Sequence, residues 1–323
     1  MAIRTALTEA FGLEYPIVLA PMASVSGGRL AAAVSNAGGL GLVGGGYGDP
    51  DWLRKELSLV RAETMRPWGV GLITWAATDE ILQLALDHGP RVLMLSFGDP
   101  RPYATDIKAA GCALICQVQD VEDARAAKKA GADFIVAQGR EAGGHGAERA
   151  TLPLVPAVVD AVAPTPVLAA GGIADGRGLA ATLMLGAQGV LMGTRFYAAR
   201  ESLGHWRAKE RIVAARGEDT RRTRVFDVVR GQEWPEPYTG RALHNRFLER
   251  WAGREEALAA ELDKEGRAFQ EAVSEGDFET AMVWAGEAVD LISEVGNAGE
   301  LVRSIGMEAE SNLRRAGRFQ RSD

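Results

Sequence analysis

The residues best suited to chemistry gather in one short segment, FIVAQGREAGGHG at residues 134–146. Its apolar start is typical of a buried strand, and glycines then surround a single histidine, His145. Glycine lets another group approach the main chain closely, and histidine can exchange a proton near neutral pH. The segment therefore favours a loop that holds a ligand against its backbone, with His145 as base and Glu141 as one partner that could orient it. The same residues also fit a flexible turn in which both the histidine and Glu141 are solvated.

Two later loops also carry glycine at the end of an apolar run. Gly171 and Gly172 lie in AGGIADG at residues 170–176, and Gly193 and Thr194 lie in MGTRF at residues 192–196. In barrels of alternating strands and helices, the loops after strands seven and eight often bind phosphate through backbone N–H groups and a helix N-terminus. The alternative is that these glycines only turn the chain. The pair of loops favours a ligand that bears a phosphate.

The first apolar run ends in Pro21 and Met22, which add flat apolar surface to the same side of the predicted fold. Because methionine packs well on an aromatic ring, a planar ring system with a phosphate suits these parts, and flavin mononucleotide (FMN) is the leading candidate. The histidines are scattered, and neither HExxH nor CxxC occurs. No metal site is therefore predicted.

A repeated pattern of short apolar run, loop and alanine-rich helix must position these loops. Eight such runs predict the strands of a (β/α)₈ barrel, because near-continuous apolar strands are typical of parallel strands covered by helices. A doubly wound open sheet is the alternative, but no GxGxxG opens a helix after the first strand. The predicted strands are residues 16–20, 39–43, 68–73, 92–97, 112–118, 134–139, 166–170 and 189–192.

From about residue 200 this rhythm stops, and Glu, Ala and Leu recur at helical spacing. We predict that residues 1–200 form the barrel and that residues 201–323 form a mainly helical C-terminal region packed on it. Trp234, Trp251 and Trp284 would anchor this region. Its histidines, His205 and His244, are expected to be structural or exposed.

The composition is that of a globular protein, with 323 residues, 47% apolar and 24% charged. A net charge of −7 gives no electrostatic reason to expect nucleic acid or an anionic membrane as partner. No apolar run reaches membrane-spanning length, and no signal-peptide pattern opens the chain. Cys112 and Cys116 are too far apart on one strand to form a disulfide. These features predict a cytoplasmic location, and they leave the oligomeric state open, a homo-oligomer included.

Several phrases together resemble the nitronate monooxygenase family, formerly called 2-nitropropane dioxygenases. They are APMASVSGG, FIVAQGREAGGHG, LAAGGIADGRG, LGAQGVLMGTRF and VWAGEAVDLI. The resemblance implies an FMN-binding barrel with His145 as the catalytic residue. The flavin contacts that it implies are Pro21, Met22, Gly143, Gly144, Gly171, Gly172, Gly193 and Thr194.

The chain departs from the family pattern beside the expected cofactor. Gly71 stands where relatives tend to carry Asn, Gln117 stands where Lys or Ser is usual, and Gly146-Ala147 replaces the common Arg-Gly. Gly71 and Gln117 are included among the expected cofactor contacts. These differences put the substrate in doubt more than the cofactor, and flavin-dependent enoyl-acyl-carrier-protein reductases resemble the same motifs.

The sequence is therefore compatible with three functions. The first is oxidation of a small nitronate or nitroalkane by molecular oxygen, with His145 as base or substrate partner. The second is reduction by NAD(P)H of an enoyl-acyl-carrier-protein or quinone acceptor through FMN. The third is a barrel that only stores flavin or scaffolds partners, which the proton carrier in the glycine loop disfavours. The physiological substrate cannot be read from the sequence.

Overall fold

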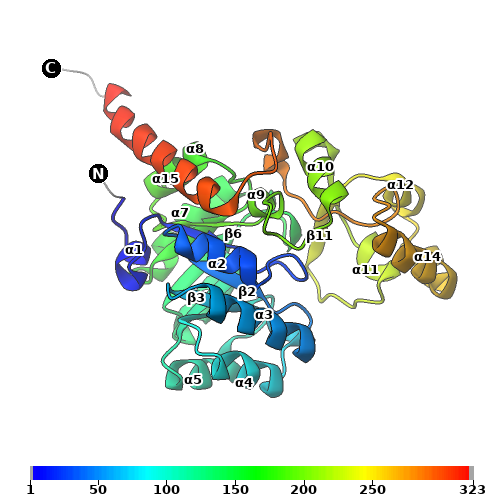
Figure 1. The fold of residues 1–323 in the computed structure, drawn as a ribbon, viewed down its shortest axis with the longest axis horizontal. Coiled ribbons are helices and arrows are strands. Elements are labelled where there is room, and N and C mark those ends of the chain that lie inside the picture. Colours follow the sequence, from blue (N-terminus) through cyan, green and yellow to red (C-terminus); the bar gives the residue numbers. More distant parts are fainter. Residues whose placement is uncertain (1–2, 320–323) are drawn as a thin grey trace.

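The computed structural model describes residues 3–319, and its centre is a barrel of eight parallel strands (Figure 1). Neighbouring strands follow the order β1-β9-β8-β6-β5-β4-β3-β2. A parallel bridge between Val18 on β1 and Leu40, just before β2, joins the two ends of this order. The predicted barrel is therefore confirmed. Its strands are β1 (Ile17–Leu19), β2 (Gly41–Gly44), β3 (Trp68–Ile73), β4 (Val92–Ser96), β5 (Ala113–Val118), β6 (Phe134–Gln138), β8 (Val167–Ala170) and β9 (Val190–Met192).

The strands are buried on both faces because alternate residues pack in different layers. On β1, Ile17 and Leu19 belong to the cluster between strands and helices, whereas Val18 belongs to the cluster inside the barrel. Phe11, from the short helix α1 (Ala6–Phe11), packs on Phe134 in the inner cluster, with ring centroids 5.6 Å apart. Apolar residues thus fill the inside of the barrel.

Seven helices cover the barrel in chain order, and four of them begin after a side chain that caps the helix. Asp49, Thr78, Asp120 and Asp175 each accept a backbone N–H at a helix N-terminus, as N-cap residues do. The helices are α2 (Gly28–Asn36), α3 (Pro50–Glu63), α4 (Asp79–Asp87), α5 (Arg101–Ala109), α6 (Val121–Lys129), α7 (Thr151–Val162) and α8 (Gly176–Met184).

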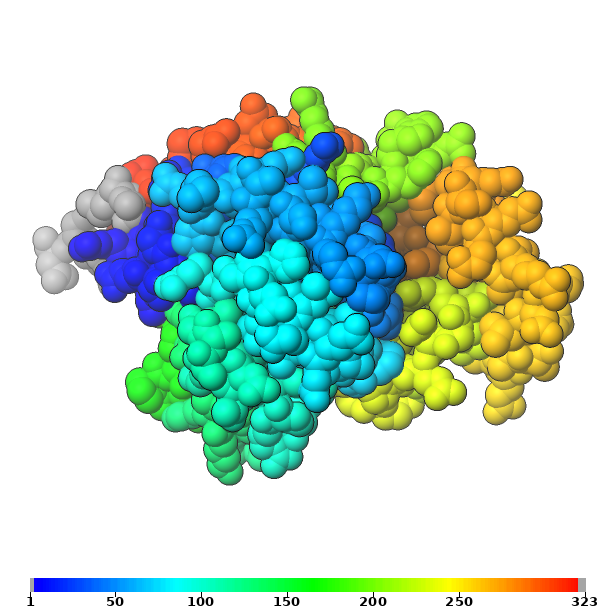
Figure 2. Space-filling model, turned by 60° about the horizontal axis from the view of Figure 1, so that its bottom comes forward, coloured from blue at the N-terminus to red at the C-terminus, as the bar shows by residue number. Residues whose placement is uncertain are grey.

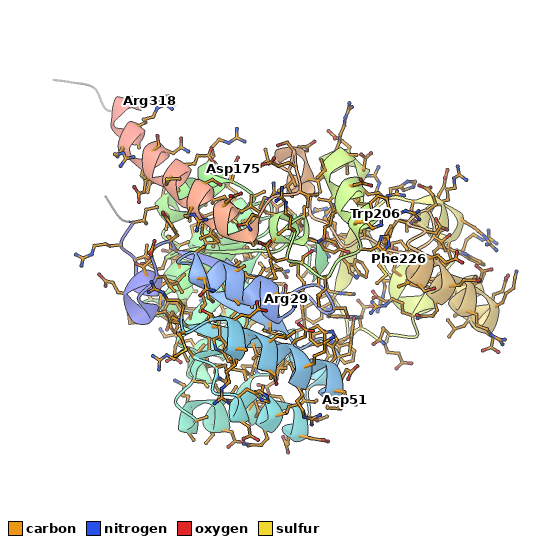
Figure 3. The ribbon with its side chains drawn as sticks, in the orientation of Figure 1. Arg29, Asp51, Asp175, Trp206, Phe226 and Arg318 are labelled. Atoms are coloured by element: carbon orange, nitrogen blue, oxygen red, sulfur yellow. The ribbon has the colours of Figure 1, made fainter. Side chains whose placement is uncertain are left out.

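The chain beyond the last barrel strand is mainly helical. Figure 2 shows its yellow and orange part gathered at one side of the barrel. Phe226, labelled in Figure 3, packs there in an apolar cluster with Phe247, Trp251 and Phe269. The helices are α9 (Thr194–Tyr197), α10 (Trp206–Ala214), α11 (Val225–Val229), α12 (Arg246–Trp251), α13 (Glu255–Ala260) and α14 (Leu262–Glu275).

A three-stranded antiparallel sheet, which the sequence reading did not predict, ties this region to the histidine loop. It consists of β10 (Thr220–Thr223), β11 (Thr239–Leu243) and β7 (Gly144–Gly146), and it pairs Gly240 with His145. The last helix, α15 (Ala298–Arg315), returns to the barrel and packs against α8 and α2. The division of the chain at residue 200 stays a prediction. Within residues 3–319, no helix has the length and apolar character needed to cross a membrane.

Candidate active site

The loops at the C-terminal ends of the barrel strands and the C-terminal region enclose a cavity of about 770 Å³. This cavity brings together every site residue that the sequence predicts, although the residues come from six different strand ends. The predicted residues that line it are Pro21, Met22, Gly71, Gln117, Gly143, Gly144, His145, Gly171, Gly172, Gly193 and Thr194.

The glycines that line the cavity have different structural roles. A Cβ added to Gly193 would lie 3.6 Å from the nearest atoms, on Ala20 and Met22, so the position is open to the cavity. Gly144 has a φ of +70° and nothing within 4 Å of an added Cβ. Gly143 differs, because its added Cβ would lie 2.6 Å from the backbone at Ala285. Gly193 and Gly144 therefore leave room for a ligand, whereas Gly143 lets two loops pack together.

Gly71 packs closely under Pro21 in this chain. An added Cβ would overlap the ring of Pro21, which lies directly over it. A larger residue such as Asn therefore fits here only if Pro21 moves. Gln117, on β5, is buried and lines the same cavity.

His145 is held by a carboxylate from the C-terminal region. Its Nε2 lies 2.9 and 3.0 Å from the two carboxylate oxygens of Asp227 on α11. Since a carboxylate accepts hydrogen bonds, this pairing assigns the ring proton to Nε2 and leaves the lone pair on Nδ1. No residue among 3–319 is recorded as a hydrogen-bond partner of Nδ1, and His145 lines the cavity. The geometry makes Nδ1 the basic atom of the site.

Burial lowers the pKa of His145 below its ordinary value of 6.5, and the hydrogen bond and charge of Asp227 oppose this effect only in part. His145 is 8% exposed. The indole of Trp234 stacks on its ring with the two planes 4° apart, and Trp284 contacts it at a tilt. The imidazole is therefore neutral near pH 7 and fixed in orientation, as a general base must be.

Trp234 lies in the loop between α11 and β11 and closes one side of the cavity. Its Nε1 donates a hydrogen bond to the hydroxyl of Tyr47 at 3.0 Å, and its ring also meets Trp75 and Phe97 edge-on. Phe97 follows β4 with a φ of +65°, which is unusual for a bulky residue. Such local strain is a feature of functional sites, where surrounding packing holds the side chain in place.

The prediction that Glu141 could orient the imidazole is wrong. Its carboxylate accepts hydrogen bonds from the backbone N–H and the hydroxyl of Thr151, which opens α7. His205 lines the cavity as well, but its Nδ1 accepts the backbone N–H of Arg207 at the start of α10. That structural role agrees with the expectation for His205.

The sequence analysis missed Asp227 on α11 and Arg230, the C-cap residue of α11 that lines the cavity, and it assigned Trp234 only as an anchor. Asp227 is 3% exposed and lies in the apolar phrase VFDVV. A buried carboxylate requires a partner, so an acidic residue in an otherwise apolar helix could have been recognised as a signal. Its partner could not be found from the sequence, because His145 lies 82 positions away.

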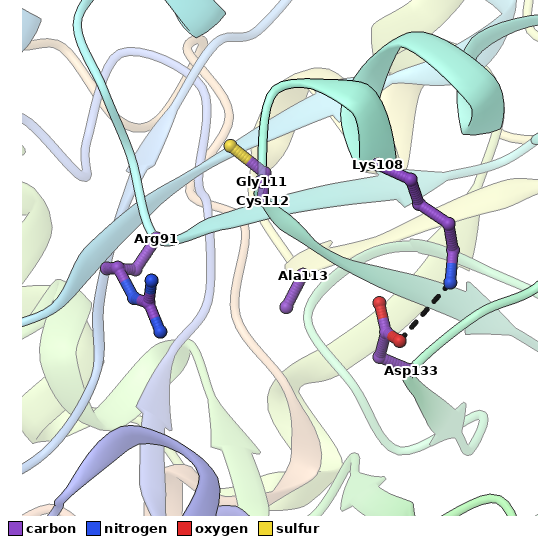
Figure 4. A pocket seen from close by; sticks show the side chains of 6 residues that line it. All are labelled: Arg91, Lys108, Gly111, Cys112, Ala113 and Asp133. Carbon is purple, nitrogen blue, oxygen red and sulfur yellow. Dashed lines mark hydrogen bonds and ion pairs between the residues drawn. The ribbon is translucent and has the colours of Figure 1, made fainter.

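A smaller hollow of about 360 Å³ lies at the N-terminal ends of β4 and β5 (Figure 4). Lys108 and Asp133 pair across it at 3.3 Å, and burial raises the pKa of the Cys112 thiol beside them. Cys116 is also buried with a raised pKa, to about 12, so neither thiol is a reactive nucleophile. No cluster of three or more metal-ligating side chains occurs in the described part of the chain.

Comparison with curated proteins gives relatives of two kinds. The chain is 34% identical to a nitronate monooxygenase of Neurospora crassa, in a match that covers 94% of this chain and 91% of that protein. It is 40% identical over 218 residues to the (3aS,4S,5R,7aS)-5-hydroxy-7a-methyl-1-oxo-octahydro-1H-indene-4-carboxyl-CoA dehydrogenase of Mycobacterium tuberculosis. The match to the dehydrogenase covers 67% of this chain and 61% of the dehydrogenase.

Solved structures resemble the protein over nearly the whole chain. The structure of FabK from Thermotoga maritima has a TM-score of 0.89 and 35% identity, and it covers 99% of this chain and 100% of that one. A nitroalkane oxidase from Streptomyces ansochromogenes has a TM-score of 0.84 and 32% identity, with 97% and 99% covered. The family model described as nitronate monooxygenase matches residues 4–81 and 73–308. The chain belongs to the nitronate monooxygenase family and is an oxidoreductase of that family.

Proposed function

We propose that the protein binds FMN in the cavity and oxidises a small nitronate or nitroalkane with molecular oxygen. The observation that carries this proposal is that His145 lines the cavity while Asp227 occupies its Nε2, which leaves Nδ1 free to act as a base. The similarity to a nitronate monooxygenase and a nitroalkane oxidase supports the reaction class.

The residues present fit a flavin. Gly193 leaves open space, and Pro21 and Met22 supply apolar surface for a flat ring. The first N–H groups of α8 are already bonded to Asp175 and Glu308, so the phosphate would rest on the loops rather than on that helix end. Those loop residues are Gly171, Gly172, Gly193 and Thr194. When bound, FMN would take the reducing equivalents of the substrate and pass them to oxygen.

The protein contributes proton transfer and orientation. A neutral nitroalkane must lose its α-proton, and Nδ1 of His145 is the base that takes it. The carboxylate of Asp227 then stabilises the imidazolium through Nε2. A preformed nitronate has no such proton to lose, so His145 serves it as a hydrogen-bond or charge partner.

The decisive experiment compares nitroethane with preformed ethyl nitronate. His145→Asn is expected to lose roughly 10² to 10⁴ in rate on nitroethane, the usual contribution of a general base, and far less on the nitronate. His244→Asn, an exposed histidine outside the cavity, is the matched control. Equal losses on both compounds would show that His145 binds the substrate without taking a proton.

A second candidate is an FMN-dependent reductase that uses NAD(P)H to reduce an enoyl-acyl-carrier-protein or quinone acceptor. The likeness to FabK and to a carboxyl-CoA dehydrogenase supports it. Anaerobic flavin reduction separates the two functions, with propionate-3-nitronate in one cell and reduced nicotinamide in the other. Rapid reduction by the nicotinamide, without reduction by nitronate or nitroalkane, would replace the first proposal by the second.

A further inference from the structure

Arg230, the C-cap residue of α11, lines the same cavity. Among the residues that line it, Arg230 is the only lysine or arginine. Its side chain is 17% exposed, so most of the guanidinium is shielded from solvent. The cavity therefore carries one permanent positive charge in its wall.

This guanidinium lacks the hydrogen bonds that a buried arginine normally makes. No hydrogen bond of its side chain is recorded with any residue from 3 to 319, and its Nη1 is buried without a partner. The nearest carboxylate oxygen, on Asp227, lies 3.9 Å away, which is too far for a hydrogen bond. The guanidinium otherwise rests on the ring of Tyr47, with Cζ 5.3 Å from the ring centroid. Because an unpaired buried donor costs free energy, an acceptor from outside the chain would stabilise the site.

The position of Arg230 separates this acceptor from the reacting carbon of the substrate. Arg230 Nη1 lies 3.9 Å from Oδ1 of Asp227, the same oxygen that pairs with Nε2 of His145, whereas the proposed function assigns the reacting carbon to Nδ1 on the other side of the ring. The two ring nitrogens point in diverging directions, so a group bound at Arg230 is a different part of the substrate. Tyr47, Phe97 and Trp234 line the cavity as well and offer aromatic surface to the atoms in between.

We propose that Arg230 binds an oxyanion, a carboxylate or a phosphate group, that the substrate carries apart from its reacting carbon. The planar fork of arginine matches both groups and forms charge-assisted hydrogen bonds with them. The inference rests on the proposed function for the place of the reacting carbon. The anion site itself depends only on the contacts of Arg230.

Binding without turnover tests the anion site directly. The probes are 3-phenylpropionate, its amide and 2-phenylethyl phosphate, titrated against the purified holoprotein with tryptophan fluorescence, since Trp234 lies in the cavity wall. At least one of the two anions is expected to bind roughly tenfold to a hundredfold more tightly than the neutral amide. The anion with the higher affinity shows whether the site prefers a carboxylate or a phosphate.

Variants assign the effect to the residue. Arg230→Gln is expected to remove the preference for the anion, and Arg230→Lys is expected to keep part of it because the charge remains. Arg246→Gln is the matched control, because that arginine on α12 is 85% exposed and lies outside the cavity. Equal binding of anion and amide, absence of binding by all three probes, or an unchanged preference in Arg230→Gln would each overturn the proposal.

A kinetic comparison tests whether Arg230 binds the second anionic group or the nitronate itself. Propionate-3-nitronate and propyl-1-nitronate share the reacting group and the chain length, and only the first carries a carboxylate. Arg230→Gln is expected to lower kcat/KM at least about tenfold for the first and to leave the second nearly unchanged. Equal losses would mean that Arg230 binds the nitronate, which contradicts the proposal. Failure of the protein to oxidise either nitronate would refute the proposed function, and the binding result would still decide the role of Arg230.

Discussion

The imidazole of His145 and the indole of Trp234 lie parallel, with 4° between their planes and 3.5 Å between their centroids. Trp234 thus covers one face of the ring, and Asp227 occupies its Nε2 edge. A substrate can reach the lone pair of Nδ1 only in the plane of the ring. By covering this face, Trp234 contributes to the burial that lowers the pKa of His145.

The first prediction concerns this effect on the pKa. Burial is the main cause that lowers the pKa of His145, so Trp234→Ala should admit water and raise the pKa toward 6.5. Because the base acts unprotonated, activity is lost as the pH falls through its pKa. The acid limb of the pH profile for nitroethane should therefore move to higher pH in the variant. Trp206→Ala, at an exposed tryptophan outside the cavity, should leave the limb in place. If the acid limb does not move in Trp234→Ala, the limb reports the titration of a group other than His145.

Asp227→Asn tests the partner of the base. The amide keeps the shape of the carboxylate but not the charge that stabilises the imidazolium, so the rate on nitroethane should fall roughly a hundredfold or more. Ethyl nitronate should be affected much less, because its proton is already gone. Asp263→Asn, exposed on α14, is the control. A similar loss on both compounds would mean that Asp227 shapes the cavity without supporting proton transfer.

The barrel could be predicted from the sequence because its strands are local apolar runs with capped helices between them. β3 (Trp68–Ile73) matches its predicted residues without change. The pairing of β7 with β11 could not be predicted, since β7 has three residues, two of them glycine, and gains its strand conformation from a partner about 95 positions away. The partner of His145 was missed for the same reason, because the contact with Asp227 depends on how the C-terminal region packs over the barrel.

A third prediction concerns Gly71, where an added Cβ would overlap Pro21. Gly71→Asn should destabilise the fold by roughly 1–3 kcal/mol, the usual cost of overpacking. Thermal unfolding measures this loss, with Gly317→Asn as control, since nothing lies within 4 Å of an added Cβ there. If Pro21 is the obstacle, Pro21→Gly should recover part of the loss in a double-mutant cycle. A strictly additive double variant would exclude that contact as the cause.

The last prediction places the phosphate of the flavin. Gly193 has a φ of −106°, which other residues adopt, and an added Cβ would meet Ala20 and Met22 at an ordinary distance of 3.6 Å. Gly193→Val should therefore fold normally, while its methyl groups enter the space that the phosphate needs. We expect flavin binding to weaken at least about tenfold, as one clash at a well-packed ligand readily costs that factor. The ratio of flavin absorbance to protein in the purified variant, compared with Gly317→Val, measures the effect. Full flavin content in Gly193→Val would place the phosphate elsewhere, and a lower Tm of the flavin-free variant than of flavin-free Gly317→Val would point to packing instead.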